Sequence, residues 1–206
     1  MVANKKTALV VVAADGFRDE EYETTRQALE RAGAMVVVAS TVKRGARSLQ
    51  NRTINPDMLI DDVDPAACAG VVFIGGFGAS QFWHDAKAHQ IVRALNGNNR
   101  LVAAIGRAPV TLGAAGVIKA KKVTGHISIY EKLANYGADY TGGKVERDGN
   151  IVTAVGPKTS TFRSSTAGWK ASRASIPARS ERRVDSASSR PEPFPSARTT
   201  NLMTTR

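Results

Sequence analysis

The chain has 206 residues, of which 42% are hydrophobic, enough for one α/β domain with a substantial core and too few to require two. Its net charge of +11 is unevenly spread, since residues 1–162 hold 20 Lys and Arg against 15 Asp and Glu, and residues 163–206 hold 9 against 3. Most of the excess of positive charge lies in residues 163–206, so the net charge indicates a basic tail rather than a polyanion-binding domain. We therefore expect a single domain over residues 5–162 and no nucleic-acid partner.

Export and membrane signals are not expected either. Near the N-terminus, two lysines precede an apolar run of only about eight residues, which reads as a first strand rather than a signal peptide. No later run approaches the ~18 apolar residues that cross a bilayer. The single cysteine, Cys68, excludes an internal disulfide and a cysteine-cluster metal site, and its place ahead of an apolar run favours a half-buried thiol. We expect a soluble, cytoplasmic protein without a membrane partner.

Short apolar runs alternate with amphipathic stretches from the start of the chain. TALVVVAA at residues 7–14 and AMVVVAS at residues 34–40 flank a helix predicted over residues 19–33, in which Tyr22 and Leu29 follow helical spacing. Acidic residues crowd the first turn of that helix, where they oppose the helix dipole. Strands that are apolar throughout are buried on both faces, so this unit predicts a mostly parallel sheet covered by helices.

The same alternation continues to about residue 157. The stretch 43–60 is less regular and predicts a short hairpin excursion around the turn at Asn55-Pro56. The later elements are predicted as strands at 71–76, 101–105, 121–124 and 151–157, and as helices at 85–95, 109–118 and 128–136. The sum is five or six parallel strands with helices on both faces.

One segment, LVAAIGRAP at residues 101–109, has the form of a nucleophile elbow, in which a buried strand runs through a tight turn into a helix. The turn position, however, is Gly106, which has no side chain. Its neighbour Arg107 stays protonated and is no nucleophile, and Cys68 precedes a different strand. A glycine relaxes a turn that costs other residues about 1 to 3 kcal/mol in strain, so the local fold can persist without the chemistry.

Four segments, taken together, resemble the ThiJ/PfpI superfamily over roughly residues 6–161: DGFRDEEYET, VVFIGGFGAS, LVAAIGRAP and VERDGNIVTAVGP. The resemblance implies a flavodoxin-like α/β sandwich of the class I glutamine amidotransferase type. It also implies a cysteine-dependent glyoxalase, deglycase or peptidase, acting on a small carbonyl compound or on a glycated or peptide substrate. Relatives of this kind also include stress chaperones and homodimers.

The family's site residues carry over position by position. The resemblance implies that Glu23 is the glutamate beside the nucleophile and that Gly75 and Gly76, with Arg107 at the elbow, form the oxyanion pocket. The nucleophile position itself is Gly106, where the family commonly has cysteine. From the residues alone, Glu23 also reads as a solvated carboxylate of the first helical turn. We further hypothesise that Glu23 pairs with Arg107.

His126 follows the strand after the elbow helix, where several relatives carry a histidine near the pocket, and a surface or capping role is its alternative interpretation. His84 and His89 are five residues apart and do not share a helical face, so the histidines predict no metal site. The glycines of GGFGAS lack the lysine of a phosphate loop. We expect neither a metal nor another cofactor.

Beyond Thr161 the sequence becomes rich in Ser, Arg, Ala, Pro and Thr, without sustained apolar periodicity. Such a composition cannot bury enough surface to offset its ordering entropy, so we predict a disordered tail over residues 163–206. The resemblance implies a closing amphipathic helix at this point, which the sequence does not continue. The tail is either read out of frame or a genuine basic tail that binds nucleic acid or acidic surfaces.

Two function classes follow from the whole sequence. The first is a catalytically impaired member of the superfamily that keeps its pocket. The second is a noncatalytic binding or holdase-type stress protein that uses exposed apolar surface.

Overall fold

A seven-stranded sheet organises the chain, in the order β11-β12-β8-β7-β1-β3-β6. The computed structural model describes residues 7–156, all within one compact unit, and the tail predicted for residues 163–206 lies outside them. The strands are β1 (Thr7–Val11), β3 (Met35–Ser40), β6 (Met58–Leu59), β7 (Gly70–Phe73), β8 (Leu101–Ile105), β11 (Val145–Asp148) and β12 (Ile151–Ala154). Only β11 runs antiparallel to its neighbour, so the prediction of five or six parallel strands is confirmed.

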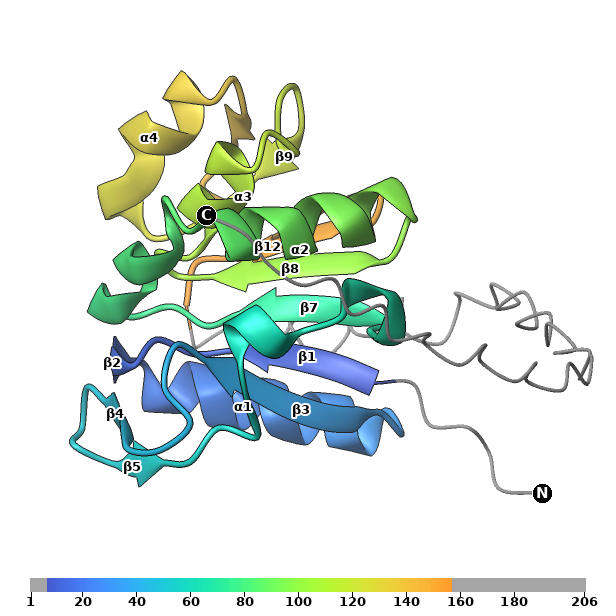
Figure 1. The fold of residues 1–206 in the computed structure, drawn as a ribbon. Helices are drawn as coiled ribbons and strands as arrows, with labels where there is room; N and C mark the ends of the chain where they lie inside the picture. Colours follow the sequence, from blue (N-terminus) through green and yellow to red (C-terminus); the bar gives the residue numbers. More distant parts are fainter. Residues whose placement is uncertain (1–6, 157–206) are drawn as a thin grey trace, which may run out of the picture. The chain divides into compact units, whose positions relative to one another are not determined.

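Helices cover both faces of this sheet, as a parallel arrangement requires. They are α1 (Asp19–Arg31), α2 (Ala86–Gly97), α3 (Pro109–Ala114) and α4 (Tyr130–Asn135). Figure 1 shows α2 in front of the sheet and α1 behind it. The change of face follows from the strand order, because the chain moves from β1 toward β3 in one direction and from β7 toward β8 in the other. The fold is the predicted flavodoxin-like α/β sandwich.

Shorter strands and turns lie outside the seven-stranded sheet. The irregular stretch forms β4 (Ala46–Ser48) and β5 (Thr53–Ile54), an antiparallel pair that joins β2 (Asp15–Phe17) in a small second sheet. The predicted hairpin is therefore present, but its turn lies at residues 49–52 and not at Asn55-Pro56. A third sheet pairs β9 (Lys122–Val123) with β10 (Asp139–Tyr140). Single 3-10 turns lie at 60–62, 65–67 and 127–129, and a longer one at Phe77–Phe82. The sequence did not predict β2, β10 or β11, which are short or polar.

The core lies where the parallel strands are covered on both faces. All four residues of β7 and all four of β12 are buried, as are all residues of β1 except its first. Phe73 and Phe82 pack edge to face with ring centroids 6.0 Å apart, and Phe17 is fully buried beside Tyr22. These contacts fix the strand ends from which the functional side chains extend.

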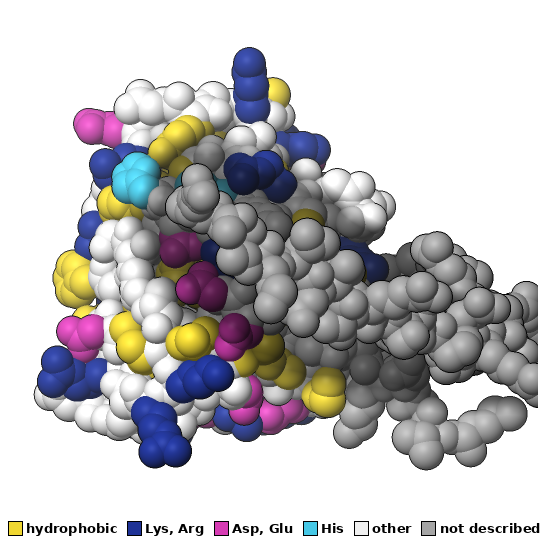
Figure 2. All heavy atoms as spheres, in the orientation of Figure 1, with side chains coloured by type: hydrophobic (Ala, Val, Ile, Leu, Met, Phe, Trp, Pro, Cys, Tyr) yellow, Lys and Arg dark blue, Asp and Glu magenta, His cyan; other side chains and the backbone are white. Residues whose placement is uncertain are grey.

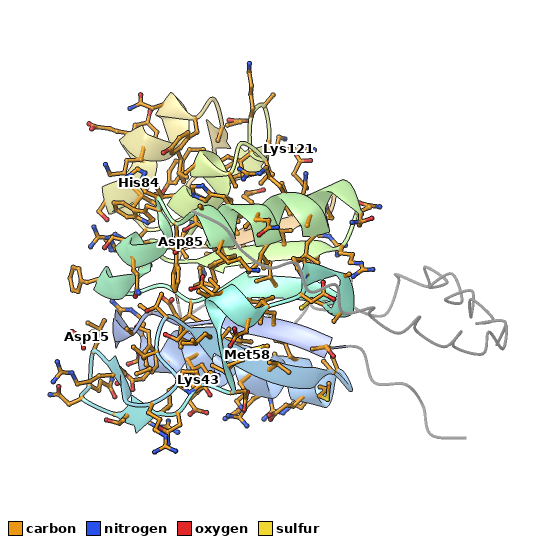
Figure 3. The ribbon with its side chains drawn as sticks, in the orientation of Figure 1. Asp15, Lys43, Met58, His84, Asp85 and Lys121 are labelled. Atoms are coloured by element: carbon orange, nitrogen blue, oxygen red, sulfur yellow. The ribbon has the colours of Figure 1, made fainter. Side chains whose placement is uncertain are left out.

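Polar contacts anchor the helices and loops around this core. Asp85 accepts a 2.6 Å hydrogen bond from the Ala88 amide and caps the first turn of α2, and Lys121 pairs with Asp148 at 2.8 Å (Figure 3). Figure 2 shows acidic and basic side chains interspersed over the coloured part of one face. Among residues 7–156, no helix is long and apolar enough to cross a membrane.

Candidate functional site

The candidate site lies at the carboxyl ends of four adjacent strands, β12, β8, β7 and β1. Parallel strands deliver their following loops to one edge of the sheet, which is where α/β folds generally bind ligands. The loops after these strands contribute, in the same order, Gly156, Gly106, Gly76 and Arg18 to a cavity of about 880 Å³. A cavity of this size falls within the usual range for small-molecule sites, roughly 300–1,000 Å³.

Gly106 forms the predicted elbow between β8 and α3. Its backbone lies in the left-handed region, at φ 61°. The Gly106 amide donates to the Ala154 carbonyl at 2.9 Å, and its carbonyl accepts from the His126 amide at 2.8 Å. These bonds connect the turn to β12 and to the loop after β9, so the left-handed conformation is held by its neighbours. A side chain at this position would be costly but fixed in direction.

The side chain that lies against the elbow is Glu21. A Cβ built on Gly106 would lie 3.0 Å from Glu21 Oε1 and 3.4 Å from Oε2. The Gly75 amide donates to Oε2 at 2.8 Å, and Arg18 Nε lies 3.6 Å from Oε1. The Glu21 side chain is only 2% exposed. The carboxyl is therefore fixed next to the one position from which a nucleophile would project.

Glu21 also has an unusual acidity for a carboxyl group. Burial raises the pKa of Glu21 from its ordinary value of 4.5 to about 7, against the opposing effects of the Gly75 hydrogen bond and the Arg18 charge. Desolvation disfavours the charged form, and here it outweighs both stabilising contacts. At neutral pH the group is thus divided between its protonated and ionised forms, which is the condition that proton transfer needs.

The sequence-based assignment of Glu23 to the position beside the elbow is wrong. Glu23 points to the surface and pairs with Arg52, so the hypothesis that it pairs with Arg107 is wrong as well. The reason is helical geometry. Glu21, Thr25 and Ala28 occupy the buried face of α1, whereas Glu23 is two residues, or roughly 200°, further round the helix.

Helical spacing in the sequence contained the signal that identifies Glu21. Glu21 precedes Thr25 by four residues and Ala28 by seven, which places all three on one face. Tyr22 and Leu29 were correctly placed on the inner side, and both are buried. Of the four carboxylates among residues 19–23, Asp19 and Glu21 are both buried. Glu21, which aligns with Thr25 and Ala28, is the one that lies against the elbow.

The glycine pair after β7 lies where the resemblance placed it, against the elbow and α1. A Cβ on Gly75 would lie 2.5 Å from Glu21 Oε2 and 2.6 Å from the Ile105 carbonyl, distances that no side chain tolerates. Gly76 lines the cavity at φ 104°. Because the Gly75 amide is occupied by Glu21, it is not available to a ligand, and Gly76 is the remaining backbone donor candidate of the pair.

Arg107 lies at the rim of the cavity rather than against a carboxylate. Its guanidinium carbon lies 5.2 Å from the Phe77 ring centroid and 5.5 Å from that of Trp83. Trp83 Nε1 donates to the Arg107 carbonyl at 3.2 Å. The buried Nε of Arg107 donates to no acceptor within the described part of the chain. Aromatic packing holds this cation in place while leaving part of its hydrogen-bonding capacity unused.

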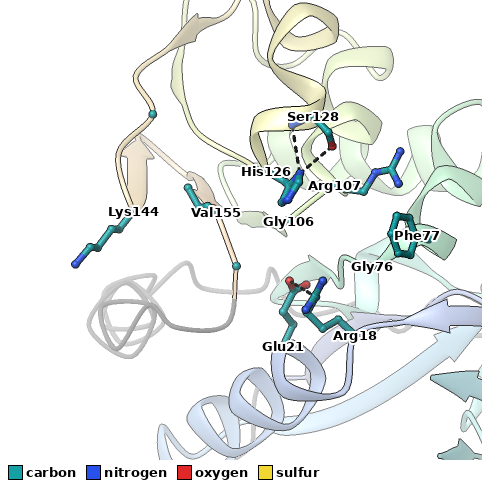
Figure 4. Close-up of a pocket in the computed structure, with 12 residues that line it drawn as sticks. Arg18, Glu21, Gly76, Phe77, Gly106, Arg107, His126, Ser128, Lys144 and Val155 are labelled. Carbon is teal, nitrogen blue, oxygen red and sulfur yellow. Dashed lines mark hydrogen bonds and ion pairs between the residues drawn. The ribbon is translucent and has the colours of Figure 1, made fainter. Parts of the chain in front are cut away.

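His126 combines the two interpretations that the sequence left open, because it lines the cavity and also caps a turn. Its Nδ1 accepts from the Ser128 amide at 3.2 Å and lies 2.8 Å from the Ser128 hydroxyl. An Nδ1 that accepts a backbone hydrogen bond leaves the ring proton on Nε2 in the neutral form. Figure 4 shows the imidazole directed into the space above Glu21 and Arg18.

Among the described residues, neither a metal site nor a thiol lies beside this cavity. Within residues 7–156, no three His, Cys, Asp or Glu side chains gather as metal ligands would. Cys68 is 5% exposed, and burial raises the pKa of its thiol. It precedes β7, whereas Gly76 follows that strand, so Cys68 is on the order of 20 Å from the cavity at about 3.3 Å per residue.

Comparisons with known proteins agree with the fold. The profile of the DJ-1/PfpI family matches residues 6–163. The uncharacterized protein MJ0967 of Methanocaldococcus jannaschii is 35% identical over 159 residues, covering 75% of this chain and 78% of the relative. Deglycase TK1284 of Thermococcus kodakarensis is 30% identical over 149 residues, covering 72% and 90%.

Solved structures of proteins from the same family also superpose on this fold. A ThiJ/PfpI domain protein from Brachyspira murdochii superposes with a TM-score of 0.78 at 29% identity, covering 84% of this chain and 100% of that one. DJ-1beta of Drosophila melanogaster superposes with a TM-score of 0.71 at 28% identity, covering 81% and 90%.

Proposed function

Because the chain belongs to the DJ-1/PfpI family, we propose that it is a member that has lost thiol-dependent catalysis at Gly106 while keeping the ligand pocket. One observation carries the proposal: residue 106 is a glycine at φ 61° whose missing Cβ would lie 3.0 Å from Glu21 Oε1. The elbow, the partner carboxyl and the glycine pair are all assembled around that position, and only the reacting atom is absent.

Thiol attack on a carbonyl carbon requires a thiolate at this point. Neither a glycine nor the cation of Arg107 supplies one, and Cys68 precedes β7 and so lies at the opposite end of that strand from the cavity. Removing a nucleophile from an otherwise intact site typically leaves only about 10³- to 10⁴-fold catalysis over water, from binding and electrostatics. We expect negligible turnover of small carbonyl compounds and of glycated or peptide substrates.

The test restores the nucleophile. Methylglyoxal consumption is measured for the protein, for Gly106→Cys and for Gly106→Ala, with circular dichroism confirming that all three fold. The alanine variant is the matched control, since it carries the same backbone strain without a thiol. We expect activity in Gly106→Cys alone, because its sulfur would project beside Glu21. Equal activity in the unmodified protein and the cysteine variant would refute the proposal.

A noncatalytic binding or holdase role is the second candidate, favoured by the apolar side chains exposed near the cavity. Phe77 is 67% exposed and lines the cavity itself. Ile127 is 70% exposed and lies in the chain between two lining residues, His126 and Ser128. Suppression of aggregation of an unfolded client by all three proteins, with no turnover by any, is the outcome that supports this role over the first.

We also propose a cytoplasmic homodimer, by analogy with relatives of the same fold. Sedimentation equilibrium of the full chain measures the assembly directly, and a single species of monomer mass at micromolar concentration contradicts it.

A further inference from the structure

Several of the residues that line the cavity beside Gly106 carry cationic or hydrogen-bond-donating side chains, set among glycine backbone and apolar side chains. Arg18, Arg107 and Lys144 contribute positive charge, and His126 contributes a ring N–H. Glu21 is the one carboxyl group among the cavity-lining residues. In Figure 4, Arg18 and Glu21 lie on one side, His126 opposite them, Arg107 near Phe77, and Lys144 at the outer edge.

The single carboxyl group does not neutralise this surface. Glu21 is held by the Gly75 amide at 2.8 Å and by Arg18 at 3.6 Å. These two contacts occupy part of its acceptor capacity, and the carboxyl group also lines the cavity. Three cations face one partly ionised acid, so the cavity is electropositive when it is empty.

Two of the donors also have capacity that the described part of the chain does not use. Arg107 Nε is buried and donates to no acceptor there, and the Phe77 and Trp83 rings pack against its guanidinium without accepting a conventional hydrogen bond. His126 Nδ1 accepts from the Ser128 amide, which leaves Nε2–H as the donor. A negatively charged ligand with acceptor atoms would accept from the Nε2–H of His126 and would be attracted by the Arg107 guanidinium.

We propose that this cavity binds a small organic anion, a carboxylate or a phosphate monoester, through Arg107 and the Nε2–H of His126. A neutral carbonyl compound is a poorer match, because it offers one acceptor to several donors and leaves the cations uncompensated. The volume of about 880 Å³ also accommodates more than a two- or three-carbon molecule. The inference rests on the proposed function only in that both use the same retained pocket.

The test compares ligands that share a shape and differ in charge. Benzoate, phenyl phosphate and neutral benzamide are titrated into the full chain by isothermal calorimetry. The fluorescence of Trp83, followed in a Trp169→Phe background, reports whether binding occurs beside Arg107, since Trp83 and Trp169 are the two tryptophans of the chain. We expect at least one anion to bind and benzamide not to bind. Preference for benzoate identifies a carboxylate ligand, and preference for phenyl phosphate a phosphate monoester.

Three variants assign the binding to the predicted donors. Arg107→Gln removes the rim cation, and His126→Asn removes the ring N–H while keeping an oxygen that accepts from the Ser128 amide. Arg93→Gln, on the exposed face of α2, is the matched control. We expect each pocket variant to weaken anion binding about tenfold, the usual loss for a hydrogen bond to a charged group, and the control to leave it unchanged.

Several results would overturn the inference. They are no anion binding at millimolar concentration, equal binding of benzamide, or equal affinity in Arg107→Gln, His126→Asn and Arg93→Gln. Because His126→Asn keeps the cap, it tests the inference even if Arg107→Gln does not fold. The failure of this inference can be distinguished from the failure of the proposed function. Anion binding together with an inactive Gly106→Cys variant would refute only the proposed loss of catalysis. An active Gly106→Cys variant without anion binding would refute only the proposed ligand class.

Discussion

Replacing Glu21 with glutamine tests the environment of the elbow through protein stability. In the folded protein the pKa of Glu21 is raised from 4.5 to about 7, chiefly by burial. A raised pKa means that the folded state holds its proton after the unfolded chain has released it. The contribution of Glu21 to stability is therefore fully present below about pH 4.5 and is lost as the pH rises to about 7.

The size of the effect follows from the shift. Each pKa unit corresponds to about 1.4 kcal/mol, so a rise from 4.5 to about 7 costs the folded protein about 3 kcal/mol once Glu21 ionises. Glutamine keeps an oxygen that accepts from the Gly75 amide and never ionises. Relative to the unmodified protein, Glu21→Gln should therefore gain about 3 kcal/mol of stability between acidic and alkaline pH.

Urea unfolding of both proteins at about pH 4 and about pH 8 measures this difference, and titrations common to the two proteins cancel. Glu23→Gln is the matched control, because Glu23 lies on the outer side of α1 and pairs with Arg52. We expect its stability difference from the unmodified protein to change by less than about 1 kcal/mol between the two pH values. A Glu21→Gln difference that is the same at both pH values would refute the argument that burial dominates at Glu21.

Two further substitutions test the packing around the site and the capping of α2. Gly75→Ala should destabilise the protein by about 1 to 3 kcal/mol, because the new methyl group would lie 2.6 Å from the Ile105 carbonyl. Gly97→Ala is its control in the same unfolding assay, since no atom outside the local helix lies within 4 Å, and should be neutral or stabilising by up to about 1 kcal/mol. Asp85→Ala removes the cap of α2 and should cost about 1 kcal/mol by thermal unfolding, whereas an unchanged midpoint would show that the 2.6 Å bond to Ala88 contributes nothing.

Local chemistry explains which features could be predicted from the sequence. The fully apolar runs at β1, β7 and β8 are buried strands because only a doubly covered parallel sheet accommodates them. The elbow could be predicted because its strand, turn glycine and first-turn proline are consecutive in the chain. The absence of a nucleophile at Gly106 likewise needed no coordinates, since a glycine has no side chain in any fold.

The arrangement of side chains around that glycine was decided only by the tertiary structure. Helical spacing separates Glu20, Glu21 and Glu23 onto different faces of α1, but the packing of α1 against the sheet decides which face is buried. Glu21 is buried, and Glu23 pairs with Arg52 at the surface. The rise in the pKa of Glu21 depends on the same packing, because desolvation is a property of the folded environment rather than of the residue type.

The cationic lining of the cavity also comes from long-range folding. Arg18 precedes α1, Arg107 follows β8 and Lys144 directly precedes the antiparallel β11. The three are far apart in the chain and meet where the parallel strands of the sheet end. The sequence by itself thus determined the alternation of strands and helices and the absence of a side chain at residue 106. The fold determined which carboxyl group lies beside the vacant position and which charges surround it, because those contacts join residues that the sequence separates.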